Sequence, residues 1–229
     1  MSLSIIIPCY NEQDHIIDTL NNIKAGIVNS IFSSKFEIII IDDGSNDQSQ
    51  DLVKHYLKKN ENINLHVNNI NLGLGHSIFK GFNLAKNDYV IWFPGDDNLE
   101  SVEISKILNS FEEDKILISI PNSKNSRTLK RRVISRLYVI ILNLITGLRI
   151  PYYNSFNIYR TKITQQYNKN FFNFGFLAMM LIFCMKENHK IKFVDFNIKE
   201  RLKGESNALT IKNLIEIIKL ILYLIFKKN

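Results

Sequence analysis

The chain has 229 residues, which suits one full-sized domain or one domain with a small appendage. Apolar residues make up 45% of it, which excludes a disordered chain, and its net charge of +7 favours an anionic partner such as nucleic acid, anionic lipid or a phosphorylated substrate. Residues 1–12 lack the features of a signal peptide, and no run of about 20 uncharged apolar residues predicts a membrane span. We therefore expect the folded chain in the cytoplasm, with Cys9 and Cys184 as buried, reduced thiols.

The first 120 residues alternate between strand and helix patterns. Short apolar runs predict strands at Leu3–Pro8, Phe36–Ile41, Ile63–Val67, Tyr89–Phe93 and Ile116–Ile120. Helical spacing predicts helices at Glu12–Ala25, from a cap at Ser45 or Asn46 to about Lys59, at Gly75–Ala85 and at Val102–Glu113. Repeated β-α-β units imply an α/β fold with a mostly parallel sheet, right-handed crossovers and flanking helices.

The composition of the chain changes after Pro121, so we divide the chain into a part at 1–120 and a part at 121–229 within one continuous domain. Pro121–Arg136 carries six basic residues and no acidic one, namely Lys124, Arg127, Lys130, Arg131, Arg132 and Arg136. The apolar run Leu137–Ile145 follows, which fits a membrane-surface element. A solvated basic face is the alternative, and a nucleic-acid site is disfavoured because no aromatic residues interleave with the charges.

The stretch Ile211–Phe226 is also strongly apolar, and its polar residues Lys212, Glu216 and Lys219 form one helical stripe. Such a helix lies in the membrane plane, packs on the first part of the chain or forms a homodimer interface. The sequence leaves these three alternatives open.

Three polar clusters follow predicted strands: Tyr10-Asn11-Glu12, Asp42–Ser45 and Asp96-Asp97-Asn98. Parallel sheets bind ligands beyond the carboxyl ends of their strands, so we expect the three loops to meet at one edge. The carboxylates of Asp96 and Asp97 repel each other unless a cation or hydrogen-bond donors compensate, and Mg²⁺ or Mn²⁺ suits them. The alternative is a solvated turn.

The second of these loops and one additional loop each offer hydrogen-bonding groups for a ligand at the same edge. A carboxylate of Asp42–Ser45 there accepts hydrogen bonds from a base or a ribose, or else the segment is a turn that caps a helix. Asn71–Gly75 precedes a helix and brings backbone N–H groups near a phosphate, although it is not the dinucleotide-binding fingerprint. Each motif alone is a weak signal.

Taken together, the motifs resemble those of family 2 glycosyltransferases with the GT-A fold, particularly the dolichyl-phosphate mannosyltransferase-like, polyprenyl-phosphate branch. The order and spacing fit over roughly residues 3–207. The matching stretches are Ile5–Glu12, Ile41–Ser45, Asn71–Gly75 with Gly81 and Ala85, Pro94–Asn98, Arg131 with Ser135, and Arg201–Ser206.

The resemblance implies a nucleotide diphosphate sugar as donor and Mg²⁺ or Mn²⁺, bound by Asp96 and Asp97, as cofactor. It implies that Asp97 and Arg201 are catalytic. It places the following residues around the donor: Pro8, Tyr10, Asn11, Glu12, Asp43, Gly44, Ser45, Gly73, Gly75 and Asp96. It places these around the acceptor and the phosphates: Arg127, Arg131, Ser135, Lys203 and Ser206.

The chain departs from the branch in two places. In the metal loop, Gly95 stands at the first Asp position and Leu99 at a Gln position. No carboxylate occurs from Lys115 to Met185, although attack by a sugar hydroxyl needs a base. We therefore expect inverting transfer of a hexose to a polyprenyl phosphate, which is already anionic, at the inner face of the membrane.

Two rival functions stay open. In the first, the chain transfers sugar to a glycan or glycolipid hydroxyl, with Asp195 or Glu187 folding back as the base. In the second, it is a non-catalytic nucleotide-sugar-binding protein at the membrane. A dehydrogenase is the least favoured reading, because the glycine fingerprint is missing.

Overall fold

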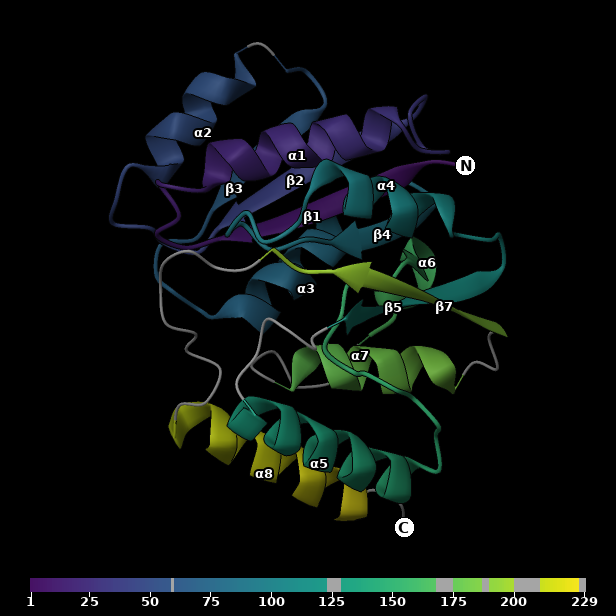
Figure 1. Cartoon of the computed structure of the whole chain (residues 1–229). Helices are drawn as coiled ribbons and strands as arrows, with labels where there is room; N and C mark the ends of the chain where they lie inside the picture. The colour runs from purple at the N-terminus through teal and green to yellow at the C-terminus, as the bar shows by residue number, and fades with distance from the viewer. Residues whose placement is uncertain (59, 123–128, 168–174, 187–189, 200–210, 227–229) are drawn as a thin grey trace.

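The computed structural model describes residues 1–58, 60–122, 129–167, 175–186, 190–199 and 211–226. Its centre is a five-stranded sheet in the order β3-β2-β1-β4-β6 (Figure 1). The strands are β1 Leu3–Cys9, β2 Phe36–Asp42, β3 Ile63–Val67, β4 Tyr89–Trp92 and β6 Tyr159–Arg160. β1 to β4 are parallel, whereas β6 runs antiparallel to β4, so the predicted mostly parallel sheet is confirmed.

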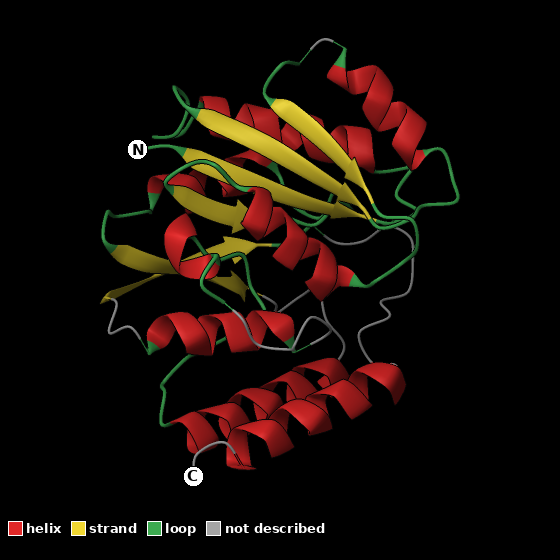
Figure 2. Cartoon of the chain, turned by 180° about the vertical axis from the view of Figure 1, so that it is seen from behind, coloured by secondary structure: helices red, strands yellow, loops and turns green. Residues whose placement is uncertain are grey.

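Helices cover both faces of this sheet (Figures 1 and 2). One face carries α1 Ile16–Val28, α2 Ser49–Leu57 and α4 Ser101–Asn109, and the other carries α3 Leu74–Leu84, α6 Thr161–Thr164 and α7 Phe176–Met185. Two glycines allow unusually close packing. A Cβ atom at Gly81 of α3 would lie 2.2 Å from Ile6 Cγ2, and one at Gly26 of α1 would lie 2.6 Å from Ile104 Cγ2.

The fifth predicted strand forms as β5 Lys115–Asn122, but it does not extend the central sheet. It pairs in parallel with β7 Lys190–Asn197, a strand that we did not predict. β6 takes the place beside β4, and a single bridge between Leu117 and Ile158 links the two sheets. β7 gives a weak sequence signal because few of its side chains are buried, chiefly Val194 and Phe196.

Two long helices, α5 Leu129–Thr146 and α8 Ile211–Phe226, lie side by side in a further layer below α7 (Figure 1). Leu220 of α8 packs against the start of α7, where a Cβ at Gly175 would lie 3.2 Å from Leu220 Cδ2. α8 has the predicted bounds, and the predicted apolar helix is the later part of α5. Among the described residues, no helix is both long enough and apolar enough to cross a membrane.

The predicted helix cap at Ser45 or Asn46 is wrong. α2 begins four residues after Ser45, and the Ser49 N–H donates to Asp47 Oδ1 at 2.9 Å. The pKa of Asp47 lies below its ordinary value, because hydrogen bonds from Ser49 and from the Gln13 N–H outweigh the effect of its partial burial. Ser45 is engaged elsewhere, at the edge where the strands end.

Candidate active site at the carboxyl edge of the sheet

The loops after β1 and β2 are joined by hydrogen bonds, as the parallel register of the two strands requires. The Asp43 N–H donates to the Cys9 carbonyl at 2.8 Å, and the Asn11 N–H donates to Ser45 Oγ at 3.0 Å. The Asn46 N–H donates to Asn11 Oδ1 at 2.9 Å. Asn11 adopts a positive φ of 55°, which asparagine tolerates better than most residues. These two predicted loops therefore converge.

Asp43 is buried, and its carboxylate is used within the protein. Its Oδ1 accepts from Asn68 Nδ2 at 2.8 Å and from the Leu72 N–H at 3.1 Å, while Oδ2 accepts from the Gly73 N–H at 2.7 Å. Lys80 Nζ donates to Asn68 Oδ1 at 2.7 Å and brings a positive charge nearby. We expected this carboxylate to face a base or ribose. The structure shows it fixing the glycine loop that leads into α3, and the contact with a base or ribose stays a prediction.

Asp42 has the environment expected of a ligand-binding residue, whereas the sequence prediction assigned the donor contact to the adjacent Asp43. Its side chain is buried with a 1% exposed fraction, and its Oδ1 accepts from the Ser45 N–H at 2.9 Å and from Gln50 Nε2 at 3.0 Å. Its Oδ2 has no hydrogen-bond partner in the part of the chain that the structure describes. A buried carboxylate oxygen without a donor is costly, so this atom suits an N–H or O–H group of a bound molecule.

The loop after β4 is fastened from two sides. Thr19 Oγ1 of α1 donates to the Gly95 carbonyl at 2.9 Å and accepts from the Asp97 N–H at 2.9 Å. The Asp97 carboxylate accepts from Asn22 Nδ2 at 2.7 Å and forms an ion pair with Lys199 Nζ at 2.9 Å. The carboxylate that we expected to bind a metal and take part in catalysis is thus paired within the protein, and sequence reasoning missed Lys199.

The same loop lies against the end of β1 and offers further oxygen atoms. A Cβ at Gly95 would lie 3.0 Å from the Pro8 carbonyl and 3.7 Å from Glu12 Cγ, so the third predicted loop joins the first. Asn98 accepts from the Lys199 N–H at 3.0 Å through its carbonyl, while its buried Oδ1 has no partner among the described residues. Asp96 stands between these residues and is half-buried.

These residues fit a hard divalent cation that is shared with a ligand. The described residues contain no cluster of three His, Cys, Asp or Glu side chains that would hold a metal by themselves. Magnesium is commonly held by one or two carboxylates together with substrate phosphates. A carboxylate from Asp96 and the amide oxygen of Asn98 meet that need. The orphaned Asn98 Oδ1 is the observation that favours the fit.

The segment 152–157 closes the edge on the side of β4. Trp92 Nε1 donates to the Ser155 carbonyl at 3.1 Å, and the ring of Phe156 lies 5.6 Å from that of Phe93. Asn154 Oδ1 is buried and has no partner in the described part of the chain. This side of the edge therefore carries no carboxylate, because the whole stretch from 115 to 185 contains no Asp or Glu.

Several predicted residues are not among the residues that form this cluster in the described part of the chain. Arg127, Arg201, Lys203, Ser206 and the alternative base Glu187 are outside the described residues, as is the side chain of Arg131. Ser135 is half-buried on α5, in the layer below α7. The alternative base Asp195 is exposed on β7, two residues before Asn197, whose Nδ2 donates to Glu103 Oε1 at 2.7 Å.

The sequence profile of Glycosyl transferase family 2 matches residues 4–187, which is most of the chain. The chain belongs to glycosyltransferase family 2. Its central sheet and flanking helices form the GT-A fold of that family. The polar edge just described lies beyond the carboxyl ends of the parallel strands, where open α/β sheets bind their ligands, so we take the cluster as the candidate active site.

Individual relatives agree with this membership. The chain is 28% identical over 146 residues to undecaprenyl-phosphate 4-deoxy-4-formamido-L-arabinose transferase from Yersinia enterocolitica, a match that covers 63% of this chain and 44% of that protein. It is 31% identical over 126 residues to poly(ribitol-phosphate) beta-glucosyltransferase from Bacillus spizizenii, covering 54% of this chain and 19% of that protein. The matches thus span less than half of either relative.

The fold is also similar to that of solved structures. Glucosyl-3-phosphoglycerate synthase from Mycobacterium tuberculosis, in complex with Mg²⁺ and uridine diphosphate, superposes with a TM-score of 0.68 at 12% identity. The superposition covers 99% of this chain and 78% of that one. At such low identity, the similarity concerns the fold alone.

Proposed function

We propose that this family 2 glycosyltransferase moves a hexose from a nucleotide diphosphate sugar to a polyprenyl phosphate, with inversion, at the inner face of the membrane. The observation that carries the choice of acceptor is the acid-free stretch from 115 to 185. Its segment 152–157 packs beside the donor loops. A phosphate oxygen attacks without a base, whereas a sugar hydroxyl needs one within hydrogen-bond reach.

The donor nucleoside occupies the edge between the loops after β1, β2 and β3. Asp42 Oδ2 accepts an N–H or O–H of the base or ribose, which supplies the partner that this buried atom lacks among the described residues. Asp43 acts indirectly, because it holds the backbone of Leu72 and Gly73 in place. Around this position lie the remaining residues assigned to the donor: Pro8, Tyr10, Asn11, Glu12, Gly44, Ser45 and Gly75.

A divalent cation, Mg²⁺ or Mn²⁺, is held by Asp96 with the help of Asn98. When bound, it neutralises the charge that grows on the leaving diphosphate. Asp97 is a positioning residue in this proposal, since Asn22 and Lys199 already hold its carboxylate. The adjacent carboxylates thus divide their roles, with Asp97 fastening the loop and Asp96 facing the donor.

Support for the acceptor comes from the chemistry of the edge and from one relative. The segment 152–157 contains no carboxylate that would repel an anionic acceptor. The Yersinia relative is named as an undecaprenyl-phosphate transferase. The Bacillus relative is named as a poly(ribitol-phosphate) glucosyltransferase, which favours a hydroxyl acceptor as the second candidate function.

The first experiment identifies the donor. Nucleoside diphosphates are screened by thermal denaturation of the full chain with and without Mn²⁺, because a ligand that binds only the folded state raises its stability. We expect one base to be selected, and we expect Mn²⁺ to enhance the shift. If the melting temperature is unchanged with every nucleotide at saturating Mn²⁺, the proposed donor site is contradicted.

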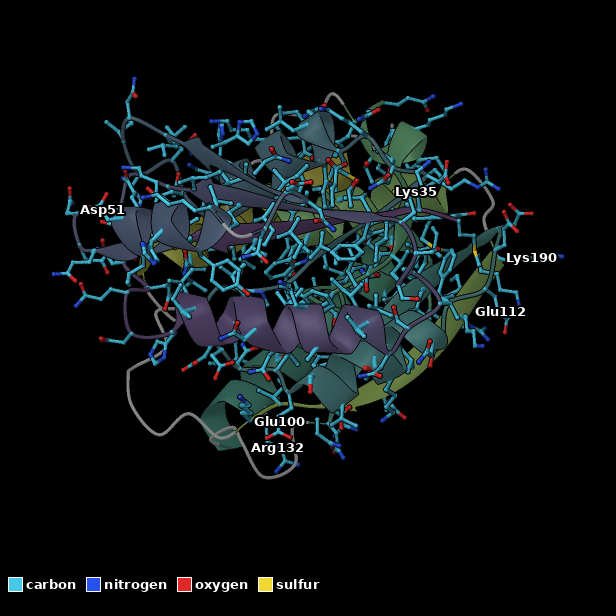
Figure 3. The ribbon with its side chains drawn as sticks, turned by 90° about the horizontal axis from the view of Figure 1, so that it is seen from above. Lys35, Asp51, Glu100, Glu112, Arg132 and Lys190 are labelled. Atoms are coloured by element: carbon cyan, nitrogen blue, oxygen red, sulfur yellow. The ribbon has the colours of Figure 1, made fainter. Side chains whose placement is uncertain are left out.

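The second experiment distinguishes the acceptors. The selected donor is incubated with a short-chain polyprenyl phosphate or with glycan acceptors, and labelled product is measured for the wild type, Asp96→Asn and Asp195→Asn. We expect lipid-linked sugar from the wild type and from Asp195→Asn, but not from Asp96→Asn. The surface variant Asp51→Asn, whose side chain projects from α2 into solvent (Figure 3), is the matched control.

Glycan labelling that disappears in Asp195→Asn would favour the hydroxyl acceptor instead. A chain that binds nucleotide but neither transfers sugar nor slowly hydrolyses the donor with Mn²⁺ would be a binding protein.

A further inference from the structure

The layer formed by α5 and α8 exposes many large apolar side chains, which we name the apolar plate. Leu144 is 77% exposed, more than any other large apolar residue of the plate. The plate comprises Val133, Leu137, Ile140, Ile141 and Leu144 of α5, with Leu214, Ile215, Ile218, Leu222, Ile225 and Phe226 of α8. Clusters of this size on one surface mark a protein or membrane contact, whereas single exposed apolar residues are ordinary.

The exposed residues form one stripe on each helix, opposite to its buried side. On α5 the exposed positions recur at intervals of three or four residues, while Tyr138 and Leu142 are buried about half a turn away. On α8 the single fully buried residue, Leu220, lies opposite the centre of the exposed stripe. Both helices therefore have a side that packs on the protein and an apolar side that the described chain leaves uncovered.

The charges beside the plate are positive. Arg132 and Arg136 are exposed on the first turns of α5, and Arg132 lies at the periphery of the molecule in Figure 3. The sequence of α5 contains no acidic residue. Glu216, the one acidic residue of α8, is largely covered and pairs with Lys219 at 3.1 Å. The partner of the plate is therefore apolar at its centre and negatively charged at its margin.

A lipid bilayer meets this description better than a second copy of the chain. A symmetric dimer would place the same surface against itself, and the described part of that surface offers the arginines of the other copy no exposed acidic residue. In a bilayer the apolar side chains enter the acyl region, while the arginines reach the lipid phosphates. We propose that the apolar plate docks on an anionic bilayer, with α5 and α8 lying in the plane of its interface.

The helices of the apolar plate and the parallel strands of the sheet can be compared by the side of the molecule on which each begins or ends. In Figure 1 both α5 and α8 begin on the side of the molecule at which the parallel strands end, so the basic first turns of α5 lie on the side of the candidate active site. The docking proposal uses no residue of that site and does not rest on the proposed function. Its test therefore needs no substrate and no turnover.

The test is co-sedimentation of the full chain with vesicles of phosphatidylcholine alone or of phosphatidylcholine with 25% phosphatidylglycerol. We expect the wild type to bind the anionic vesicles, and more weakly at high salt because part of the attraction is electrostatic. The double variant Leu144→Ser with Leu222→Ser removes two residues of the plate, so we expect its vesicle partitioning to fall by about tenfold or more. Arg132→Ala with Arg136→Ala is expected to lose about tenfold on anionic vesicles only.

The matched control is Val28→Ser with Val102→Ser, which removes two exposed apolar residues, 67% and 64% exposed, from α1 and α4. We expect it to bind like the wild type. A second measurement uses the fluorescence of an introduced tryptophan and does not require removing apolar side chains from the plate. Leu144→Trp is expected to lose fluorescence in vesicles with brominated acyl chains, while Val102→Trp is not, and the buried Trp92 gives the same background in both.

Two results would overturn the proposal. In the first, wild-type chain stays with the supernatant at every lipid composition. In the second, light scattering shows a dimer that the Leu144→Ser, Leu222→Ser variant abolishes while vesicle binding is unchanged, which would make the plate an interface between two copies.

Discussion

Lys199 Nζ lies 2.9 Å from Asp97 Oδ2, and this ion pair joins the segment after β7 to the loop after β4 across more than 100 residues of chain. The Lys199 N–H also donates to the Asn98 carbonyl, so the contact has two points. The pair holds the Asp97 carboxylate within the protein. It also makes the position of the end of β7 part of the geometry of the candidate site.

We expect Lys199→Met to lower the free energy of unfolding by about 1 kcal/mol, the range of a partly exposed ion pair with a hydrogen bond. Urea denaturation measures this loss. The control is Lys54→Met, which removes the fully surface-exposed pair with Asp51 on α2 and should change stability by no more than about 0.5 kcal/mol. Equal losses in the two variants would show that Lys199 does not fasten the loop.

The proposed roles of the adjacent aspartates predict unequal effects of their substitution on metal-dependent binding. Asp96→Asn removes the proposed ligand, so Mn²⁺-dependent affinity for the nucleoside diphosphate should fall by about tenfold or more. Asp97→Asn can still accept from Asn22, and its affinity should stay within about threefold of the wild type. Calorimetric titration of both variants, with Asp51→Asn as control, measures the difference. A larger loss of affinity in Asp97→Asn than in Asp96→Asn would show that Asp97 binds the metal.

The three hydrogen bonds that Asp43 accepts predict a stability effect away from any ligand. Asp43→Ala leaves Asn68 and two backbone N–H groups without their acceptor, which costs about 1–3 kcal/mol or more for a buried charged group. Denaturant unfolding measures the loss, with the exposed Asp14→Ala as control. Unchanged stability together with lost donor binding would instead place Asp43 in direct contact with the nucleotide.

The close contact of α3 with β1 predicts that Gly81→Ala destabilises the chain. The new methyl group would lie 2.2 Å from Ile6 Cγ2, and overpacking of this kind costs about 1–3 kcal/mol. Ile6→Val does not remove the Cγ2 atom, so Ile6→Ala is the partner that makes room. The double variant Gly81→Ala, Ile6→Ala should be less destabilised than the sum of the two single variants. Strict additivity would show that the two residues do not contact each other.

The two cysteines are buried and form no disulfide, as the sequence predicted. Burial, reinforced by the charge of Asp42, raises the pKa of the Cys9 thiol from 9.0 to about 12. The folded state therefore favours the protonated thiol. This contribution to stability is complete below pH 9 and is lost as the pH rises from 9 towards 12. At pH 8 a thiol-reactive dye should label neither cysteine in the native chain and both in denaturant; rapid native labelling would contradict the burial.

Much of the fold was predictable because it depends on local patterns. Runs such as Phe36–Ile41 are apolar on both faces and short, which is typical of buried parallel strands, and α8 matches the predicted range because its stripe is strongly periodic. The pairing of β5 with β7 was not predictable, since periodicity gives the existence of a strand and not its neighbour. The start of α2 was missed because Asp47, Ser45 and Asn46 are all residues that cap helices.

By itself, the sequence determined that this chain is an α/β protein whose polar loops follow its parallel strands, because apolar periodicity and loop chemistry are local properties. Only the tertiary structure decided which groups each aspartate of the candidate site contacts. Asp43 and Asp97 are paired by Gly73 and Lys199, residues that are distant in the sequence. The role of a carboxylate depends on which donors surround it in space, and that is fixed only when the strands and helices have packed.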